Sequence, residues 1–512
     1  MLLGTAGYVQ CTVMGLGVKR GLGFGVVAAF VSAMLVAPPT ASAVVPAGSA
    51  TQTRLTAPVS TPSVAPEGRG SVTSVSPESV NLWVVPVRWS DGESIGPDTL
   101  STTVEDAATF FRTDSNGRLD VVSRTLPVET ADRSCNPPVV SMSRKLAKRN
   151  KRIDKEDDVV VLAFPRASGC GSVSYAGDAG FSWKVVACWD GFEDAHCLKH
   201  GLGHALFNLH HDNLIKCEDS GRPVSYGGTC VLEENGNPYT IMGDGIHGAG
   251  LNAIDLIKEG LRSRSSAVFA ATSTQLELSP RSSPSGTTVV VVPLLNRGGG
   301  AGGARSQLQL EYRTAGGTDS WLGNTAISAN PGTGVLVSLQ GDSPYAELDR
   351  HPDGEYAFGD PLDRGLLNMH PELPDFRPGM QAGDSWAAPD GSVAISIVSL
   401  SPDAATVRID HAQDTAAPYP FKLRRPSTYS LGQKSRVFIG FDTPGDNVAV
   451  RRFRVEITGR KPFYVAADKA VSSVSQGDVT RVLPQGRYRV RVVAEDYSGN
   501  KTASNQRRVV VR

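Results

Sequence analysis

The chain lacks an excess of charge of either sign, because 51 Lys and Arg stand against 51 Asp and Glu in its 512 residues. That balance favours neither nucleic acid nor another polyanion as a partner. Beyond residue 43 the sequence also lacks any apolar run long enough to cross a membrane. Its seven cysteines include no C-x-x-C pair, which argues against a cysteine-ligated zinc site. The composition fits a globular protein of roughly two to four domains.

Residues 1–43 predict a secretory signal. Lys19 and Arg20 precede an apolar stretch over residues 21–37, and Ala41-Ser42-Ala43 supplies the small residues of a cleavage site. A membrane anchor is the alternative interpretation. We expect a secreted protein, extracellular or at the cell surface, that is monomeric and has no membrane span after the signal is removed.

The cysteines agree with export. Cys11 lies inside the predicted signal, and an even number of cysteines remains, which in an exported chain predicts three disulfides. Fifteen pairings of six cysteines are possible, and the sequence does not choose among them. Cys217 with Cys230 is the most local pairing. The six remaining cysteines are Cys135, Cys170, Cys188, Cys197, Cys217 and Cys230.

A cluster of histidines carries the most specific chemistry. His200 and His204 are four residues apart, so a helix places both imidazoles on one face, one turn apart. His210 follows six residues later, where a chain leaving the helix can return to the same ion. Three neutral imidazoles and a water form the ligand set of an open zinc site, so zinc is the predicted cofactor. His196 and His247 lack ligand spacing and are expected at the surface or behind the ligands.

His200, His204 and His210 match the metal positions of the metzincin pattern H-E-x-x-H-x-x-G-x-x-H. Ile241-Met242-Gly243 resembles the Met-turn of that clan, which places Met242 beneath the metal. With the flanks over residues 78–262, the chain resembles the gametolysin-type secreted zinc peptidases. The resemblance implies an α/β peptidase domain with the zinc helix packed beneath the sheet, and zinc held by His200, His204 and His210.

Two positions depart from this pattern. Gly201 stands where the family has the Glu that acts as general base on the zinc-bound water, so no catalytic residue is assigned. Phe207 stands where the family has a Gly that turns the chain out of the helix, and a bulky residue there costs on the order of 1 kcal/mol. Asn208 tolerates a left-handed conformation better. A turn at Asn208 would present His211 instead of His210; the spacing favours His210.

The remaining chain divides by composition. The sequence predicts a multidomain α/β plus β protein, in which a metzincin-like α/β domain is followed by a β-sandwich and a C-terminal immunoglobulin-like or fibronectin type III-like β-domain. The expected segments are a signal at 1–43, a Pro/Ser/Thr-rich linker at 44–77, the peptidase-like domain at 78–262, the β-sandwich at 263–415 and the last β-domain at 416–512.

Two functions follow from the missing base. The first is a zinc-binding pseudopeptidase with weak or no activity that binds an extracellular protein or peptide. The alternative is an active zinc-dependent endopeptidase that cleaves extracellular proteins with a substitute base from Asp212, Glu193 or Asp244. Because Gly is a poor helix former, Gly201→Glu is expected to restore chemistry without harming the fold.

Overall fold

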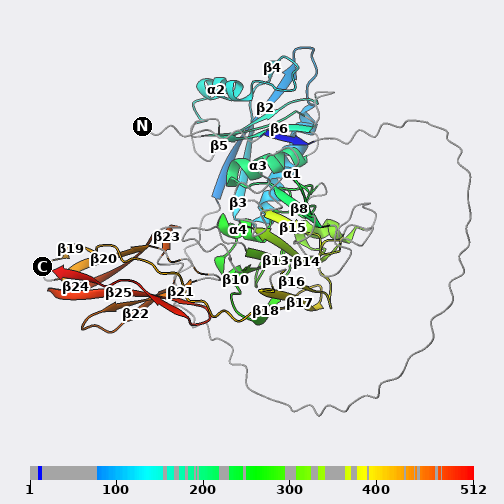
Figure 1. Cartoon of the computed structure of the whole chain (residues 1–512). Helices are drawn as coiled ribbons and strands as arrows, with labels where there is room; N and C mark the ends of the chain where they lie inside the picture. The colour runs from blue at the N-terminus through cyan, green and yellow to red at the C-terminus, as the bar shows by residue number, and fades with distance from the viewer. Residues whose placement is uncertain are drawn as a thin grey trace, which may run out of the picture. The chain divides into compact units, whose positions relative to one another are not determined.

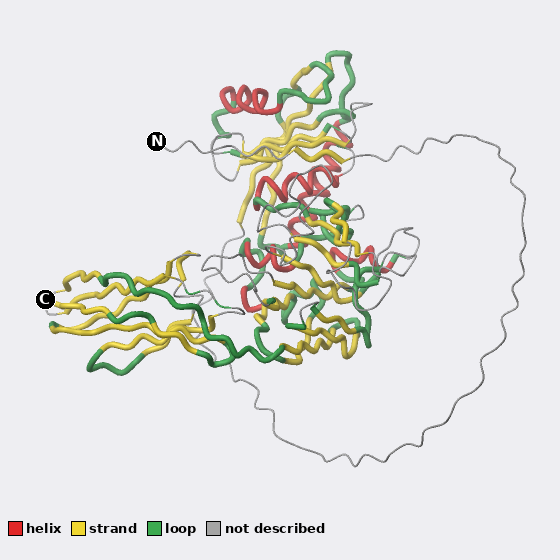
Figure 2. The backbone as a smooth tube through the Cα atoms, in the orientation of Figure 1, coloured by secondary structure: helices red, strands yellow, loops and turns green. Residues whose placement is uncertain are grey.

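The computed structural model describes residues 10–13, 78–153, 158–166, 172–178, 183–189, 192, 195–217, 230–245, 249–294, 307–324, 332–340, 364–370, 377–388, 391–431, 434–442, 444, 446, 450–466, 471–473 and 476–512. The predicted linker (44–77), the predicted signal apart from 10–13, and Cys170, Glu193 and His247 lie outside the described residues. Within the described part the chain is multidomain and consists mostly of sheets with few helices (Figures 1 and 2). No described helix is long and apolar enough to span a bilayer.

The first sheet has the order β1-β6-β7-β5-β2-β3, and β4 also pairs with β2. Strands β2, β3, β5 and β7 are parallel, whereas β6 is antiparallel to β7 and β1 is antiparallel to β6. The unbroken apolar run at 159–164 predicts a strand buried on both faces, and this is confirmed, because every residue of β5 is buried. The bounds are β1 Gln10–Val13, β2 Glu78–Trp89, β3 Leu119–Thr125, β4 Glu129–Ala131, β5 Asp158–Ala163, β6 Ser172–Asp178 and β7 Lys184–Cys188.

Helices cover both faces of this sheet. Because side chains alternate along a strand, β2 sends Leu82 and Val84 to one face and Trp83 and Val85 to the other. The first face shares an apolar core with α1 (Pro97–Asp114) and α3 (Ala195–Phe207), and the second shares one with α2 (Val139–Arg149). Helix α3, which carries His200 and His204, therefore packs against the sheet, where it contacts β6 and β7.

A second seven-stranded sheet has the order β10-β12-β13-β14-β15-β8-β9. Strands β8 and β9 come from the segment 78–262, yet β8 pairs in parallel with β15 of the following segment. The sheet shares one apolar core with a four-stranded sheet of order β11-β18-β17-β16. The bounds are β8 Asp212–Cys217, β9 Cys230–Glu233, α4 Ala253–Lys258, η1 Arg264–Ser266, β10 Ala267–Phe269, β11 Thr274–Leu278, β12 Val289–Pro293, β13 Gln307–Arg313, η2 Gly317–Gly323, β14 Gly334–Gln340, β15 Arg364–Leu367, β16 Ser385–Ala387, β17 Val393–Leu400 and β18 Ala405–His411.

The last part of the chain forms two further sheets around its own core. One has the order β19-β20-β24-β23 and the other β22-β21-β25-β26, with β27 also paired to β25. Along β20, β21 and β25 buried and more exposed residues alternate, as expected for strands with one face on a core. The bounds are β19 Ser427–Leu431, β20 Lys434–Asp442, β21 Val450–Ile457, β22 Phe463–Ala466, β23 Val471–Ser473, β24 Gln476–Pro484, β25 Gly486–Asp496, β26 Lys501–Ala503 and β27 Arg507–Val511.

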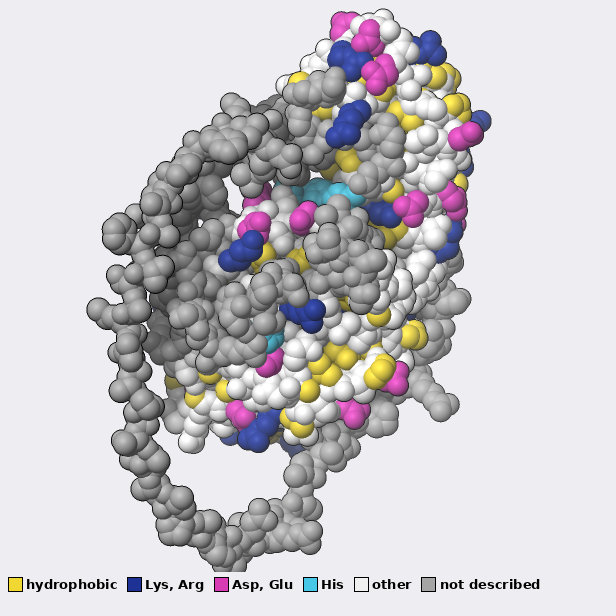
Figure 3. Space-filling model, turned by 90° about the vertical axis from the view of Figure 1, so that its right-hand side faces the viewer, with side chains coloured by type: hydrophobic (Ala, Val, Ile, Leu, Met, Phe, Trp, Pro, Cys, Tyr) yellow, Lys and Arg dark blue, Asp and Glu magenta, His cyan; other side chains and the backbone are white. Residues whose placement is uncertain are grey.

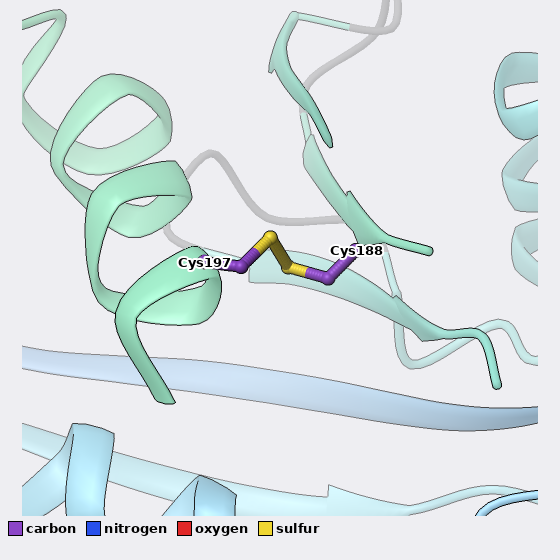
Figure 4. Close-up of a disulfide and its surroundings, with 2 residues drawn as sticks. All are labelled: Cys188 and Cys197. Carbon is purple, nitrogen blue, oxygen red and sulfur yellow. A yellow bond between two sulfur atoms is a disulfide. The ribbon is translucent and has the colours of Figure 1, made fainter. Parts of the chain in front are cut away.

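A disulfide between Cys188 and Cys197 joins the end of β7 to the first turn of α3 (Figure 4). It fixes the helix that carries two of the candidate ligands to the strand beneath it. Cys135 is disulfide-bonded as well. Cys217 and Cys230 lie directly opposite each other in the antiparallel pair β8–β9. Opposed residues of such a pair have a Cα separation of roughly 4.5–5.5 Å, which lies within the range of a disulfide.

Candidate metal centre

Helix α3 carries His200 near its middle and His204 in its last turn. The helix ends at Phe207, and the next residue, Asn208, takes the left-handed conformation with φ of 50°. The Asn208 N–H donates to the His204 carbonyl at 3.0 Å. Asn accepts this conformation more readily than most residues because of its short polar side chain. The chain therefore turns out of the helix one residue later than the metzincin pattern would have it.

That shift selects the third histidine. Ring nitrogens of His200, His204 and His211 all lie within 4.8 Å of one another, and His210 is not a member of this group. The structure therefore groups His211, and not the favoured His210, with the two helical rings, since one extra residue before the turn brings His211 to them. Figure 3 shows a patch of histidine side chains at the surface, with acidic side chains beside it.

Each of the three rings uses its Nδ1 on an oxygen. His200 Nδ1 lies 2.8 Å from the Ile241 carbonyl, His204 Nδ1 lies 2.6 Å from the Leu209 carbonyl, and His211 Nδ1 lies 3.2 Å from Glu234 Oε1. A carbonyl or carboxylate oxygen only accepts, so each Nδ1 must carry the proton. In this tautomer Nε2 is the nitrogen that ligates a metal.

The free nitrogens face each other. His200 Nε2 and His204 Nε2 are 2.9 Å apart. Two lone pairs at this distance repel unless a cation or a proton lies between them. Two imidazole nitrogens on one tetrahedral zinc are separated by about 3.3 Å, given Zn–N bonds of about 2.0–2.1 Å. The residues present therefore fit a zinc ion in number, donor type and tautomer.

Burial keeps the rings of His200 and His204 neutral. Burial, and after it the charges of the neighbouring histidines His204, His211 and His196, hold the pKa of His200 well below its usual value. Burial, followed by the charge of His211, lowers the pKa of His204 to about 4. Because metal binding requires the deprotonated imidazole, both rings are in the binding form at neutral pH.

Met242 supports both ligand-bearing segments. It is fully buried, and a Cβ on Gly203 would lie 2.3 Å from its sulfur, so Gly203 makes room for the thioether against α3. The Met242 carbonyl accepts a hydrogen bond from the Asp212 N–H at 2.9 Å, directly after His211. The neighbouring Ile241 carbonyl orients His200. The loop over 241–242 thus fixes the helix and the returning chain relative to each other.

Gly201 faces the sheet. A Cβ at this position would lie 2.6 Å from Val186 Cγ1 on β7. The glycine lets α3 pack closely on β7, so the expectation that Gly201→Glu would leave the fold unharmed is wrong.

Gly201→Glu is expected to lower the free energy of unfolding by about 1–3 kcal/mol, the usual cost of overpacking. Val186→Ala leaves Cβ as the nearest atom, at 3.7 Å, which is ordinary contact. The double variant should therefore be more stable than the sum of the two single changes by about 1 kcal/mol or more. Urea unfolding of the four proteins measures this coupling. Strict additivity would show that Gly201 does not pack on Val186.

Two of the three substitute bases, Asp212 and Asp244, do not join the histidines, and the third, Glu193, lies outside the described residues. The Asp212 carboxylate is buried, accepts from Asn252 Nδ2 at 2.7 Å and lies 3.5 Å from Arg364 Nε, away from the ring nitrogens. No carboxylate, Asp244 included, belongs to the histidine group in the described part of the chain. Glu234 was missed by sequence reasoning, because only the β8–β9 hairpin brings it to His211, 23 residues away.

His196 lies one turn before His200 on α3. Its ring centroid is 5.9 Å from that of His200 at an interplanar angle of 38°, and it is partly buried. It is therefore next to His200 and outside the group of three candidate ligands, as the spacing predicts.

Comparisons with known proteins find similarity among solved structures alone. No protein family and no curated protein matches the sequence. Among solved structures, wild-type OgpA from Akkermansia muciniphila matches at 10% identity over 85% of this chain and 94% of that chain, with a TM-score of 0.20. An inactive OgpA in complex with an O-glycopeptide substrate matches at 9% identity over 85% and 93%, with a TM-score of 0.18. A bacterial orthologue of human α-L-iduronidase matches at 15% identity over 46% and 33%, with a TM-score of 0.16. At these TM-scores none of the matches assigns a fold or an activity to the chain.

Proposed function

We propose that His200, His204 and His211 hold one zinc ion, and that the chain is an exported, gametolysin-type zinc peptidase homologue with weak or no proteolytic activity. The proposal rests on one observation above all. Three imidazoles converge, and each has its Nδ1 against an oxygen acceptor, so Nε2 is the nitrogen through which each ring would ligate a cation. A peptide or protein from outside the cell is the proposed partner.

The missing base argues for weak activity. Bound zinc supplies a Lewis acid and lowers the pKa of a water ligand to about 7. A general base typically adds about 10²–10⁴-fold to such a hydrolysis. Gly201 has no proton acceptor, and among the described residues no carboxylate joins the three rings as one group. The Glu234 carboxylate lies beside one ring, where it accepts from His211 Nδ1. The histidines can hold and orient, but the side chain that would take the proton is absent from its usual position.

A second candidate is an active zinc endopeptidase of extracellular proteins, and the position of His196 favours it. A neutral imidazole beside the ligand group can accept a proton, and His196 is the titratable side chain one turn away from His200. In this candidate, cleavage by the wild type would be lost in His196→Gln while bound zinc stays constant.

Metal analysis and a peptidase assay on the full chain test the proposal. We expect one zinc per chain after purification without chelator and close to none in His204→Ala, because two histidines hold zinc poorly. The wild type should cleave casein or a quenched peptide library little or not at all. Val186→Ala removes the methyl group that a Cβ at position 201 would meet. In that background Gly201→Glu should raise chelator-sensitive cleavage by at least about tenfold over Val186→Ala alone, provided that the carboxylate extends from the sheet-facing side of α3 to the ring nitrogens.

Three outcomes would contradict parts of this proposal. A wild type without zinc, even after reconstitution, would remove the metal site. Vigorous chelator-sensitive cleavage by the wild type would remove the pseudopeptidase assignment and favour the second candidate. Zinc in both proteins without cleavage by the double variant would show that Gly201 is not the only lost part.

A further inference from the structure

The neutral charge of the whole chain conceals a strong asymmetry. Residues 416–512 contain 19 Lys and Arg against seven Asp and Glu, a net formal charge of +12. Since the complete sequence is neutral, residues 1–415 carry −12. A compact β unit of fewer than a hundred residues with this charge repels itself, and an anionic partner relieves that repulsion.

Part of this charge gathers at one pocket. A pocket of about 630 Å³ is lined by three arginines and a set of hydroxyl side chains from β19, β27 and the residues beside them. Among the described residues its lining contains no Asp or Glu side chain. The side chains that matter here are Arg425, Arg508, Arg512, Ser427, Thr428 and Ser430.

Strand register extends the positive surface beyond the pocket. Arg489 on β25 lies directly opposite Arg508 on β27, and Arg487 lies opposite the exposed Val510. Like charges directly opposite each other in an antiparallel pair destabilise it. Arg491, two residues along the same face from Arg489, is neutralised by Glu456 at 2.6 Å. Within the described chain, Arg425, Arg489, Arg508 and Arg512 make no such ion pair.

The chemistry of the lining selects the ligand. Arginine presents a planar fork of N–H donors that binds carboxylate, sulfate or phosphate through two bonds, and all three cations of the pocket are arginines. Serine and threonine hydroxyls both donate and accept, which suits sugar hydroxyls. No aromatic ring lines the pocket, whereas binding of single-stranded nucleic acid uses rings on which bases stack.

We propose that residues 416–512 bind an acidic polysaccharide, whose sulfate or carboxylate groups pair with Arg425, Arg508 and Arg512. The binding is independent of the histidine site and retains the exported protein on an anionic matrix. The alternative use of these charges is to protect the edge strands β19 and β27 from pairing with other chains. Protection of the edge strands needs charge but no ligand, so binding measurements distinguish it from polysaccharide binding.

The experiment measures binding of the full chain to heparin (sulfate and carboxylate), hyaluronate (carboxylate only) and neutral dextran over a series of NaCl concentrations. We expect salt-dependent binding to at least one of the two acidic polymers, which identifies the acidic group, and none to dextran. Arg425→Gln/Arg508→Gln/Arg512→Gln should weaken this binding by at least about tenfold. The matched control Arg451→Gln/Arg460→Gln/Lys461→Gln removes three exposed charges from the same unit and should weaken it by less than about threefold.

A second triple variant separates binding from folding. Lysine at 425, 508 and 512 keeps the charge and removes the two-bond fork, so an intermediate affinity supports recognition through arginine. Equal losses in the glutamine triple and its control would overturn the proposal, and so would an absence of binding to both acidic polymers. Duplex DNA or phosphatidylglycerol vesicles bound as tightly as heparin would also overturn it. Salt-sensitive self-association would overturn the proposal too, because the arginines of residues 416–512 would then bind the negatively charged residues 1–415 of a second copy.

Discussion

His211→Ala is expected to remove the zinc from the protein, whereas His210→Ala is expected to keep one zinc per chain. The two histidines are neighbours in sequence, but only His211 has a ring nitrogen within 4.8 Å of those of His200 and His204. Structural zinc sites bind with about 10–16 kcal/mol shared among four ligands, so losing one ligand should weaken affinity on the order of 100-fold or more. Competition with a chromogenic chelator measures this directly.

Two further variants sharpen this result. Glu234→Gln removes the carboxylate that holds His211 Nδ1 and should weaken zinc by about tenfold, within the range for groups that orient ligands. Asn208→Gly keeps a residue that adopts the left-handed conformation and should retain zinc. Loss of zinc in His210→Ala, with retention in His211→Ala, would contradict the turn at Asn208 and restore the metzincin spacing.

The choice of the third histidine shows where sequence reasoning reached its limit. The i, i+4 spacing of His200 and His204 follows from helix geometry, and the structure has both on α3. The third position depends on which residue ends the helix in a left-handed conformation, and Phe207 and Asn208 were the two candidates for that turn. Phe207 would be strained in this conformation and Asn208 is not, so the conformational preference of Asn208 outweighed the family spacing.

Other features were invisible in the sequence because they depend on long-range packing. The apolar run at 159–164 predicted β5, but nothing in residues 212–233 predicts that β8 pairs with β15, about 150 residues later. The helix pattern alone also does not reveal that position 201 faces Val186, where a side chain would have no room. The charge of residues 416–512 was present in the sequence and was hidden by counting the whole chain.

A buried ionic network joins the end of α1 to the segments that follow the candidate metal centre. Arg281 pairs with Asp114, and its Nη1 lies 3.7 Å from Asp319 Oδ2. Arg313 Nη1 donates to Asp319 Oδ1 at 2.7 Å, and Arg313 Nη2 donates to Asn252 Oδ1 at 3.3 Å. All of these side chains are buried. The network continues through Asn252 Nδ2 to Asp212, the residue after His211.

Gly250 shows how closely Arg281 is fitted. A Cβ at Gly250 would lie 2.0 Å from Arg281 Nη2, so the backbone there leaves the space that the guanidinium fills. Arg281 Nε also donates to the Leu251 carbonyl at 2.6 Å. Arg281 therefore satisfies a carboxylate and a backbone carbonyl that have no access to water.

Arg281→Ala is expected to lower the free energy of unfolding by about 3–5 kcal/mol, because it leaves Asp114 as a buried charge without its cation. Arg408→Ala, which breaks an exposed pair with Asp410, is the matched control and should cost at most about 1 kcal/mol. Because the network ties residue 114 to residues 281–319, the wild type should unfold these segments in one transition and Arg281→Ala in two. Urea unfolding measures the loss of free energy, and calorimetry of thermal unfolding shows the number of transitions. Equal costs for the two arginines would mean that water reaches Asp114, and the network would then contribute no more than a surface ion pair.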